Sequence, residues 1–318
     1  MMIFRNNEQV SQLISMQECI GVMKSLFMLD TSVDIVNPLR SKMIVEKNKI
    51  FGMMPAYIRP YNVMGVKVLS VFSENYKKGL SSHQGILHLF ETITGKLLMS
   101  LEADEVTAIR TAAVSALMTD LLAVNDSKKL CVLGSGKQAE KHLEAILLVR
   151  DIEEVFIWSR NRNNASKVIK KVSKENRSVS FQVVNSVKEA VKSADIICTV
   201  TASNTPILEQ SWLKKGTHIN AVGACTPNSR ELKSAIILNA DVFVDNYESA
   251  INESGDLLIP AKENNIPVRD IIKANINEIL HDTTIINKSK TTVFNSLGLG
   301  IEDLAVANFC YKKIKKAL

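Results

Sequence analysis

Residues 129–158 read KLCVLGSGKQAEKHLEAILLVRDIEEVFIW, and this stretch decides the fold. The apolar run at 130–133 predicts a buried strand, and the spacing of apolar residues over 137–149 predicts a helix. A second apolar run at 154–158 predicts another strand. Two strands joined through a helix form a crossover unit whose strands lie parallel.

The same alternation continues towards the C-terminus. Further strands are expected at 179–184, 195–201, 218–223 and 241–245, and helices at 164–176 and 186–194. Strands that alternate with helices form a parallel sheet covered on both faces. The sequence therefore predicts an α/β domain with a doubly wound parallel sheet.

The N-terminal part of the chain has a different pattern. Short apolar runs between residues 40 and 101 are separated by Asn, Gly and Pro, and the connections are too short for helical crossovers. We expect a mainly antiparallel sheet there, flanked by helices at 8–30 and 104–124. The end of the chain predicts a strand, a turn and a helix that return to this first part. We therefore predict a discontinuous α+β domain, residues 1–122 and 292–318, and an α/β domain, residues 123–291.

Composition excludes several classes of protein. The 318 residues carry a formal charge of +6, but the lysine-rich stretches read as solvated helix faces, without the interleaved aromatics of a nucleic-acid site. Five cysteines without a CxxC pair indicate a reduced, intracellular protein. No apolar run approaches the roughly 20 residues of a membrane span, and the N-terminus lacks a signal core. We expect a cytoplasmic protein with no membrane, nucleic-acid or metal partner.

A glycine-rich turn joins the first strand of the α/β domain to its helix. It comprises Gly134, Ser135, Gly136, Lys137, Gln138 and Ala139, which fit G-x-G-x-x-A. The first glycine permits a tight turn, the second admits a pyrophosphate close to the backbone, and the alanine allows close packing of helix and strand. The alternative is a structural turn without a nucleotide. The strand–turn–helix context favours a Rossmann domain that binds NAD(P).

The end of the next strand bears on the choice between NAD and NADP. A ribose-binding Asp or Glu is expected about 20 residues after the glycines. The chain instead reads Trp158-Ser159-Arg160-Asn161-Arg162, in which Ser159 and Arg160 suit a 2′-phosphate because a guanidinium donates paired hydrogen bonds. The alternative is that Arg160 is a solvated turn residue. We expect NADPH, with some use of NADH.

Two basic residues are unusual in the N-terminal domain. Lys67 lies within an apolar strand, on the same face as Leu69 and Val71. An ammonium there is either an edge residue that reaches water or a functional group in a pocket. Arg110 begins a helical stretch of small residues, and the alternative is an ordinary surface arginine.

Together these segments resemble the ornithine cyclodeaminase/mu-crystallin family nearly end to end. The matching segments are Arg40-Ser41, Met54-Pro55-Ala56, Gly65-Val66-Lys67, Ser82-His83-Gln84, Arg110-Thr111-Ala112-Ala113, the Gly134 turn, Val222-Gly223, Glu253-Ser254-Gly255-Asp256, Ser296-Leu297-Gly298 and Glu302-Asp303. The resemblance implies a homodimer whose discontinuous domain binds the substrate. It implies that Arg40, Lys67 and Arg110 hold the substrate carboxylate and polarise the reacting centre. We also expect Thr111, Thr201, Val222 and Gly223 to contact the cofactor.

One segment departs from the cyclodeaminase pattern. Those members carry a catalytic aspartate after the fifth Rossmann strand, where this chain has Cys225. A thiol with an ordinary pKa near 8.5 does not replace a carboxylate as base at neutral pH. This difference and the segment with Ser82 and His83 look more like mu-crystallin and the imine-reducing members. His83 is either a proton donor near the substrate or a structural histidine.

The sequence thus predicts an NAD(P)H-dependent imine reductase. The expected substrate is a cyclic ketimine carboxylate such as Δ1-pyrroline-2-carboxylate, reduced to L-proline. Arg40 and Arg110 would hold the carboxylate, and Lys67 would orient the imine and relay a proton. The alternatives are ornithine cyclodeaminase, an alanine-type amino-acid dehydrogenase, and a crystallin-like protein that binds NADPH or a small ligand without catalysis.

Overall fold

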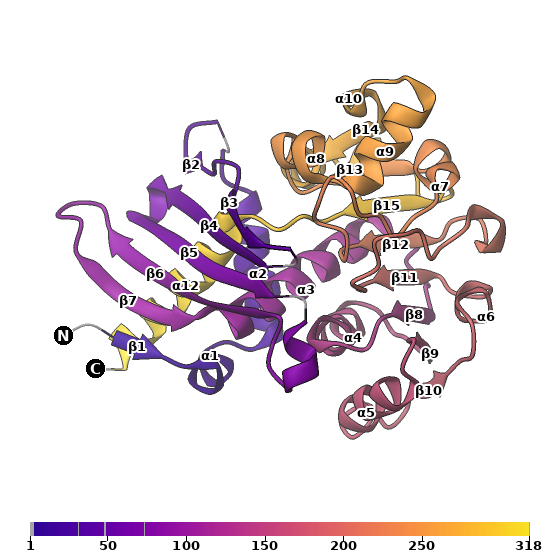
Figure 1. Cartoon of the computed structure of the whole chain (residues 1–318), viewed down its shortest axis with the longest axis horizontal. Helices are drawn as coiled ribbons and strands as arrows, with labels where there is room; N and C mark the ends of the chain where they lie inside the picture. The colour runs from indigo at the N-terminus through magenta and orange to yellow at the C-terminus, as the bar shows by residue number, and fades with distance from the viewer. Residues whose placement is uncertain (1–2, 31, 48, 73, 318) are drawn as a thin grey trace. The chain divides into compact units, whose positions relative to one another are not determined.

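The structure is a computed structural model that describes residues 3–30, 32–47, 49–72 and 74–317 (Figure 1). The chain divides into two compact units. Unit 1 comprises Met1–Arg110 and Gly298–Leu318, and unit 2 comprises Thr111–Leu297. The division falls within one helix, α3 (Ala103–Leu122). The domain boundaries expected from sequence, after residue 122 and before residue 292, differ from these unit boundaries and stay a prediction.

Unit 2 is built on a parallel sheet with the strand order β10-β9-β8-β11-β12-β15-β13-β14. The strands are β8 (Lys129–Leu133), β9 (Glu154–Trp158), β10 (Ser180–Val183), β11 (Ile196–Thr199), β12 (His218–Ala221), β13 (Asp241–Val244), β14 (Ile272–Asn275) and β15 (Thr292–Asn295). Along the chain, the first five follow the spatial order 3-2-1-4-5 of a Rossmann sheet. The order reverses between β8 and β11, and such a switch point opens a ligand crevice at the carboxyl ends of the strands. The predicted doubly wound α/β class is confirmed.

Helices connect these strands. They are α4 (Lys137–Val149), α5 (Arg162–Val172), α6 (Val187–Val191), α7 (Ser234–Asn239), α8 (Tyr247–Glu253), α9 (Gly255–Asn264), α10 (Val268–Ile271) and α11 (Ile276–His281), with short 3-10 helices at Gln210–Trp212 and Thr283–Ile285. Apolar side chains of the strands, such as Leu133, Ile197 and Val293, form a buried core with Ile236 and Leu257 of the helices. Packing of these apolar side chains holds the sheet together. The loops at the carboxyl ends of the strands can therefore carry polar residues.

Unit 1 is built on a mainly antiparallel sheet with the order β1-β7-β6-β5-β4-β2, and β3 also pairs with β4. The strands are β1 (Ile3–Arg5), β2 (Ile35–Val36), β3 (Ser41–Glu46), β4 (Lys49–Ile58), β5 (Val63–Phe72), β6 (His83–Glu91) and β7 (Leu97–Glu102), and β1 alone among those described pairs in parallel. The helices are α1 (Asn7–Leu13), α2 (Met16–Phe27), the first part of α3 and α12 (Gly300–Lys316), with 3-10 helices at Arg59–Tyr61 and Asn75–Lys78. Figure 1 shows α12, in yellow, crossing behind the sheet.

The two faces of this sheet differ. One face carries Met54, Leu87 and Leu101, which are buried under α12 and its neighbours. The other face carries Phe51 and Met53, which are 38% and 43% exposed, because strand residues alternate between faces. These exposed side chains leave the second face uncovered in the described part of unit 1. Contiguous exposed apolar side chains often mark an interface.

Two sequence expectations are corrected by the structure. The helix predicted over residues 8–30 is two helices, α1 and α2, which are separated at Ile14. Ser15 begins the second helix with a capping box, in which its hydroxyl accepts from the Glu18 N–H and its own N–H donates to the Glu18 carboxylate. The strand at 292–295, expected to return to the first domain, lies in the parallel sheet of unit 2 between β12 and β13.

Candidate functional site

Lys67 lies on a central strand of unit 1. Its strand, β5, pairs with β4 on one side and β6 on the other, and the residue is 1% exposed. The possibility of an edge lysine that reaches water is therefore wrong. A buried ammonium needs compensating partners, since its desolvation costs several kcal/mol.

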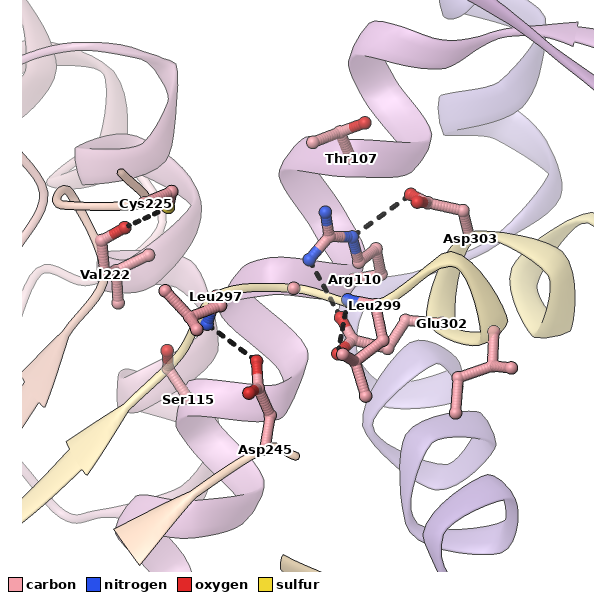
Figure 2. A network of polar contacts seen from close by, with 12 residues as sticks. Thr107, Arg110, Ser115, Val222, Cys225, Asp245, Leu297, Leu299, Glu302 and Asp303 are labelled. Carbon is pink, nitrogen blue, oxygen red and sulfur yellow. Dashed lines mark hydrogen bonds and ion pairs between the residues drawn. The ribbon is translucent and has the colours of Figure 1, made fainter. Parts of the chain in front are cut away.

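The partners of Lys67 come from α3 and from the first turn of α12. Its Nζ donates to Asp303 Oδ2 at 2.5 Å and to Thr107 Oγ1 at 3.3 Å. Arg110, on α3, donates from Nε to the other oxygen of Asp303 at 3.1 Å and from Nη1 to Glu302 Oε2 at 2.8 Å. Figure 2 shows Glu302 and Asp303 on either side of the Arg110 guanidinium. Because both carboxylates are fully buried, they fix the two cations in place.

The guanidinium groups of Arg40 and Arg110 both lie against Gly298. Its φ of +77° is the left-handed region that glycine adopts without strain, and a Cβ at this position would collide with the guanidinium of Arg110. Arg40 donates from Nη2 to the Gly298 carbonyl at 3.0 Å. The sequence predicted that Arg40, Lys67 and Arg110 act together, and the structure brings these three residues into one cluster. The possibility of a surface arginine at 110 is wrong, since Arg110 is buried.

The protonation of the cluster follows from its charges. Burial lowers the pKa of Lys67 to about 8, and the charges of Arg110 and Arg40 act in the same direction, against the attraction of Asp303. Burial opposes the ionisation of Asp303, but Arg110 and Lys67 outweigh it and lower the pKa of that carboxyl. At neutral pH these five side chains therefore carry one more positive than negative charge. A ligand with one carboxylate matches that excess.

Ser82 and His83 lie at the start of β6. The Ser82 hydroxyl is 3.0 Å from His83 Nδ1. The register pairs His83 with Val71 and Leu87 with Lys67, so His83 lies on the same face of the sheet as the lysine. Burial of the ring and the charge of Lys67 both lower the pKa of His83, although the residue as a whole is exposed. The imidazole is neutral at pH 7, and its role as proton donor or structural residue stays a prediction.

The glycine-rich turn of unit 2 has the features that a pyrophosphate requires. Gly134 follows β8 with a φ of +135°, and a Cβ there would lie 2.7 Å from the Val200 carbonyl. Gly136 is the N-cap of α4, with no side-chain cap and open space where a Cβ would be. Ala139 is fully buried against the sheet. A helix start without a side-chain cap leaves backbone N–H groups for an anion, so the turn fits a dinucleotide.

The end of β9 lies beside this turn. Ser159 Oγ is 2.7 Å from Ser135 Oγ, which joins the predicted ribose and pyrophosphate residues. Arg160 follows as an exposed residue, and Asn161 caps α5 by accepting from the N–H groups of Asn163 and Asn164. Since Asn161 ends the loop, Arg160 is held at the strand end with its side chain in solvent. This loop, residues 159–161, contains no Asp or Glu.

The loops after β11 and β12 hold the other predicted cofactor residues of unit 2. Thr201 donates from its N–H and hydroxyl to one oxygen of Glu231, and Gly223 donates its N–H to the other. Val222, which directly precedes Gly223, is buried. Thr111 is a buried residue at the start of the unit 2 part of α3. Its contact with a cofactor stays a prediction.

Cys225 lies in the loop between β12 and α7. The Cys225 thiol is partly buried and donates to the Val222 carbonyl at 3.4 Å (Figure 2). Among the described residues, no group of His, Cys, Asp or Glu side chains is arranged to hold a metal ion. None of the described helices is both long and apolar enough to cross a membrane.

Comparisons with known proteins show the family of this chain. The model of the ornithine cyclodeaminase/mu-crystallin family matches residues 1–317. The chain belongs to this family. It is 38% identical to the ketimine reductase mu-crystallin of Mus musculus over 278 residues, 87% of this chain and 85% of the relative.

Two solved structures of the family are also close. The Δ1-pyrroline-2-carboxylate reductase of Thermococcus litoralis, in complex with NADH and L-proline, has a TM-score of 0.95 and 34% identity, and the match covers 99% of this chain and 98% of that one. An archaeal alanine dehydrogenase, described as a dimer with bound NAD, has a TM-score of 0.91 and 29% identity over 100% of this chain and 97% of that one.

Sequence reasoning assigned no role to four acidic residues that the structure places in the two site regions. These are Glu231, Asp256, Glu302 and Asp303. Asp256, Glu302 and Asp303 lie in segments that carry the family resemblance, but nothing in those segments says which cation or loop each carboxylate contacts. Each lies far along the chain from at least one of its partners, as Asp303 does from Lys67, so spacing alone gave no signal.

Proposed function

We propose that this protein is an NAD(P)H-dependent reductase of cyclic ketimine carboxylates, with Δ1-pyrroline-2-carboxylate as substrate and L-proline as product. The observation that carries the proposal is the cluster in which buried Lys67 and Arg110 bind two carboxylates and partly buried Arg40 binds the Gly298 carbonyl. Its excess of one positive charge suits a single substrate carboxylate. The mouse protein is named as a ketimine reductase and the Thermococcus litoralis protein as a Δ1-pyrroline-2-carboxylate reductase, and both names support the same reaction class.

The residues of unit 1 have separate tasks in this reaction. Arg40 and Arg110 bind the carboxylate through charge-assisted hydrogen bonds. Lys67, protonated at neutral pH with a pKa of about 8, is able to donate a proton to the imine nitrogen. Asp303 holds Lys67 and Arg110 in a fixed orientation, and this preorganisation accelerates the reaction without reorganisation cost. Bound NAD(P)H supplies the hydride for the C=N carbon.

The residues of unit 2 bind the cofactor. Gly134, Gly136 and Ala139 form the pyrophosphate turn, and the loops at Thr201 and Gly223 lie at the switch-point edge of the sheet. Ser159 and Arg160 bind the 2′-phosphate of NADPH, which is the preferred cofactor, while NADH is also used. A carboxylate that would repel a 2′-phosphate is missing from the described loop after β9.

Reduction assays with defined imines test the proposal. The purified protein is given NADPH or NADH with a five-membered or six-membered ketimine carboxylate, and cofactor oxidation and the cyclic amino acid are measured. We expect turnover with NADPH and formation of L-proline from the five-membered imine. Ammonia release from ornithine with NAD, or NADH formation from alanine, without reduction of either imine would overturn it. Ligand binding without any turnover would favour a binding protein.

A homodimer is part of the proposal. The uncovered face of the unit 1 sheet exposes Met43 by 59%, and Phe51 and Met53 lie on the same face. A second copy of the chain would bury this surface, and the similar archaeal alanine dehydrogenase is described as a dimer. Light scattering after gel filtration is expected to give the dimer mass, and Met53→Glu is expected to give the monomer. The cysteines, which are mostly buried and form no disulfide, fit the reducing cytoplasm that we propose as location.

A further inference from the structure

Two fully buried carboxylates of unit 2 have no role in the function proposed above. Glu231 lies in the loop between β12 and α7, and Asp256 is the second residue of α9. An ionised carboxylate is costly to bury unless donors satisfy it. The contacts of each carboxylate therefore indicate what it holds.

Glu231 joins the two loops that end β11 and β12. One of its oxygens, Oε1, accepts from the Thr201 N–H at 2.8 Å and from the Thr201 hydroxyl at 2.5 Å. The other, Oε2, accepts from the Gly223 N–H at 2.9 Å. A Cβ at residue 223 would lie 2.5 Å from Oε2, so glycine is required for this approach. One side chain thus fixes two neighbouring loops at the carboxyl edge of the sheet.

Asp256 in turn fixes the backbone that carries Glu231. Its Oδ1 accepts from the N–H groups of Glu231 and Leu232, both at 2.9 Å. The Glu231 carbonyl accepts from Ile207 and Leu208. A side chain at Gly255 would collide with the Ser229 carbonyl, so α9 packs directly on this loop. The backbone of Glu231 is therefore held at both its N–H and its carbonyl group.

We infer that Glu231 is a positioning residue for the nicotinamide cofactor, which it serves by holding the loops of Thr201 and Gly223, and that Asp256 positions Glu231. The inference rests on the proposed function, because it takes the cofactor to bind at these loops. Ligands of open α/β sheets bind beyond the carboxyl ends of strands next to the switch point, and β11 and β12 end there.

Electrostatics support this arrangement. Burial raises the pKa of Glu231, while its hydrogen bonds from Thr201 and Gly223 act in the opposite direction. Both oxygens of Glu231 accept hydrogen bonds, and of these donors the Gly223 N–H also donates to the Thr199 carbonyl at 3.1 Å. An amide at this position would turn an N–H₂ group towards one of these donors, which leaves a buried donor unpaired. The loop contacts are therefore sensitive to an isosteric change.

Binding of the reduced cofactor to Glu231→Gln tests the inference. NADH is titrated without imine and followed by its fluorescence, and the KM for NADH, the KM for the imine and the thermal midpoint are measured in parallel. We expect about tenfold weaker NADH binding and a matching rise in the KM for NADH, because a buried donor loses its partner. The KM for the imine should change less than twofold.

Glu278→Gln is the matched control. Glu278 is also a carboxylate of unit 2 that accepts a backbone N–H, from Asn275, but it caps α11 and is distant in sequence from both loops. We expect NADH binding of this variant to equal the wild type. Thr201→Val removes one donor to Glu231 and keeps the shape of the side chain. It should weaken NADH binding about threefold, and much less when Glu231 is already glutamine, since interacting residues are not additive.

The outcomes separate this inference from the proposed function. If the wild type reduces the imine but Glu231→Gln binds NADH within twofold of it, the positioning role is overturned and the function stands. A lowered thermal midpoint with unchanged NADH affinity also overturns it, because that indicates structural support only. If Glu231→Gln does not fold, Thr201→Val decides by the same criterion. If the wild type binds no reduced cofactor, both proposals are overturned.

Discussion

Among the described residues, each unit has two carboxylates that are completely buried, and the two pairs have different partners. Glu302 and Asp303 of unit 1 accept from the side chains of Lys67 and Arg110, and Glu302 also accepts from a backbone N–H. Glu231 and Asp256 of unit 2 accept from backbone N–H groups and one hydroxyl. All four are completely buried.

The partners of a buried carboxyl determine the direction in which its pKa shifts. Burial raises the pKa of any carboxyl, but two cations outweigh this effect and lower the pKa of Asp303. Asp256 has only neutral donors and an acidic neighbour, Glu231, so burial raises its pKa to about 7. In the function that we propose, the acids of unit 1 hold charges that act on a substrate, and the acids of unit 2 hold the backbone in the shape that a cofactor needs.

The largest expected effect separates the two tasks. Lys67→Met removes the ammonium but keeps a long apolar side chain, so imine reduction should fall by about a thousandfold, the scale of a lost proton donor. Affinity for NADPH, measured by fluorescence titration, should stay within twofold because the cofactor loops lie in unit 2. Turnover equal to the wild type would remove Lys67 from the mechanism, and loss of cofactor affinity would contradict the division of tasks.

The next effect is the pH dependence of stability. The folded pKa of Lys67, about 8, lies below the ordinary value of 10.5, so between these pH values the unfolded chain binds more protons. Stability contributed by this residue therefore rises with pH across that window, by on the order of 3 kcal/mol. Urea unfolding of the wild type and Lys67→Met at pH 8 and 10 should show the rise only in the wild type. Parallel curves would contradict the lowered pKa.

The contribution of Asp256 to stability is expected to change with pH in the opposite direction to that of Lys67. The folded pKa of Asp256, about 7, lies above the ordinary 3.8, so the native state binds more protons between these values. Its contribution to stability is present at low pH and is lost as pH rises towards 7. The change should amount to about 1–2 kcal/mol, since Glu231 shares the titration. Asp256→Asn should flatten this slope in urea unfolding between pH 4 and 7, and an unchanged slope would assign it to other groups.

A smaller effect is expected at the ribose end of the cofactor. Arg160→Ser should lower kcat/KM with NADPH by about tenfold, the value of a charge-assisted contact in solvent. The same ratio with NADH should not change. Arg162→Ser is the control, because Arg162 is a neighbouring exposed arginine in the first turn of α5. Equal losses with both cofactors would show that Arg160 does not select the 2′-phosphate.

Much of the fold was predictable because local patterns determine it. The apolar runs and the Gly134 turn indicated strands and crossovers of the Rossmann sheet, and the short connections between the apolar runs of residues 40–101 indicated an antiparallel sheet. The break at Ser15 was missed, although its Ser-x-x-Glu pattern is a local signal. The position of β15 between β12 and β13 has no local signal, because tertiary packing alone selects the neighbours of a strand.

The candidate site was predictable only in part, for a similar reason. A lysine within an apolar strand signals a buried charge, so Lys67 was singled out from sequence. Its compensating Asp303 lies on another element at the far end of the chain, and no spacing rule connects the two. Gly298 illustrates the same limit. A side chain at this position would collide with the guanidinium of Arg110, and this contact is evident only in three dimensions.

The smallest expected effect concerns Cys225, the residue at which this chain departs from the cyclodeaminase pattern. Its thiol donates to the Val222 carbonyl, and a serine hydroxyl is able to keep that bond. If proton transfer depends on Lys67 rather than on this residue, Cys225→Ser should keep kcat for imine reduction within twofold and leave the pH profile unchanged. A drop of tenfold or more, or a shifted profile, would make the thiol part of the proton path. The charge cluster of unit 1 would then not be sufficient for the chemistry.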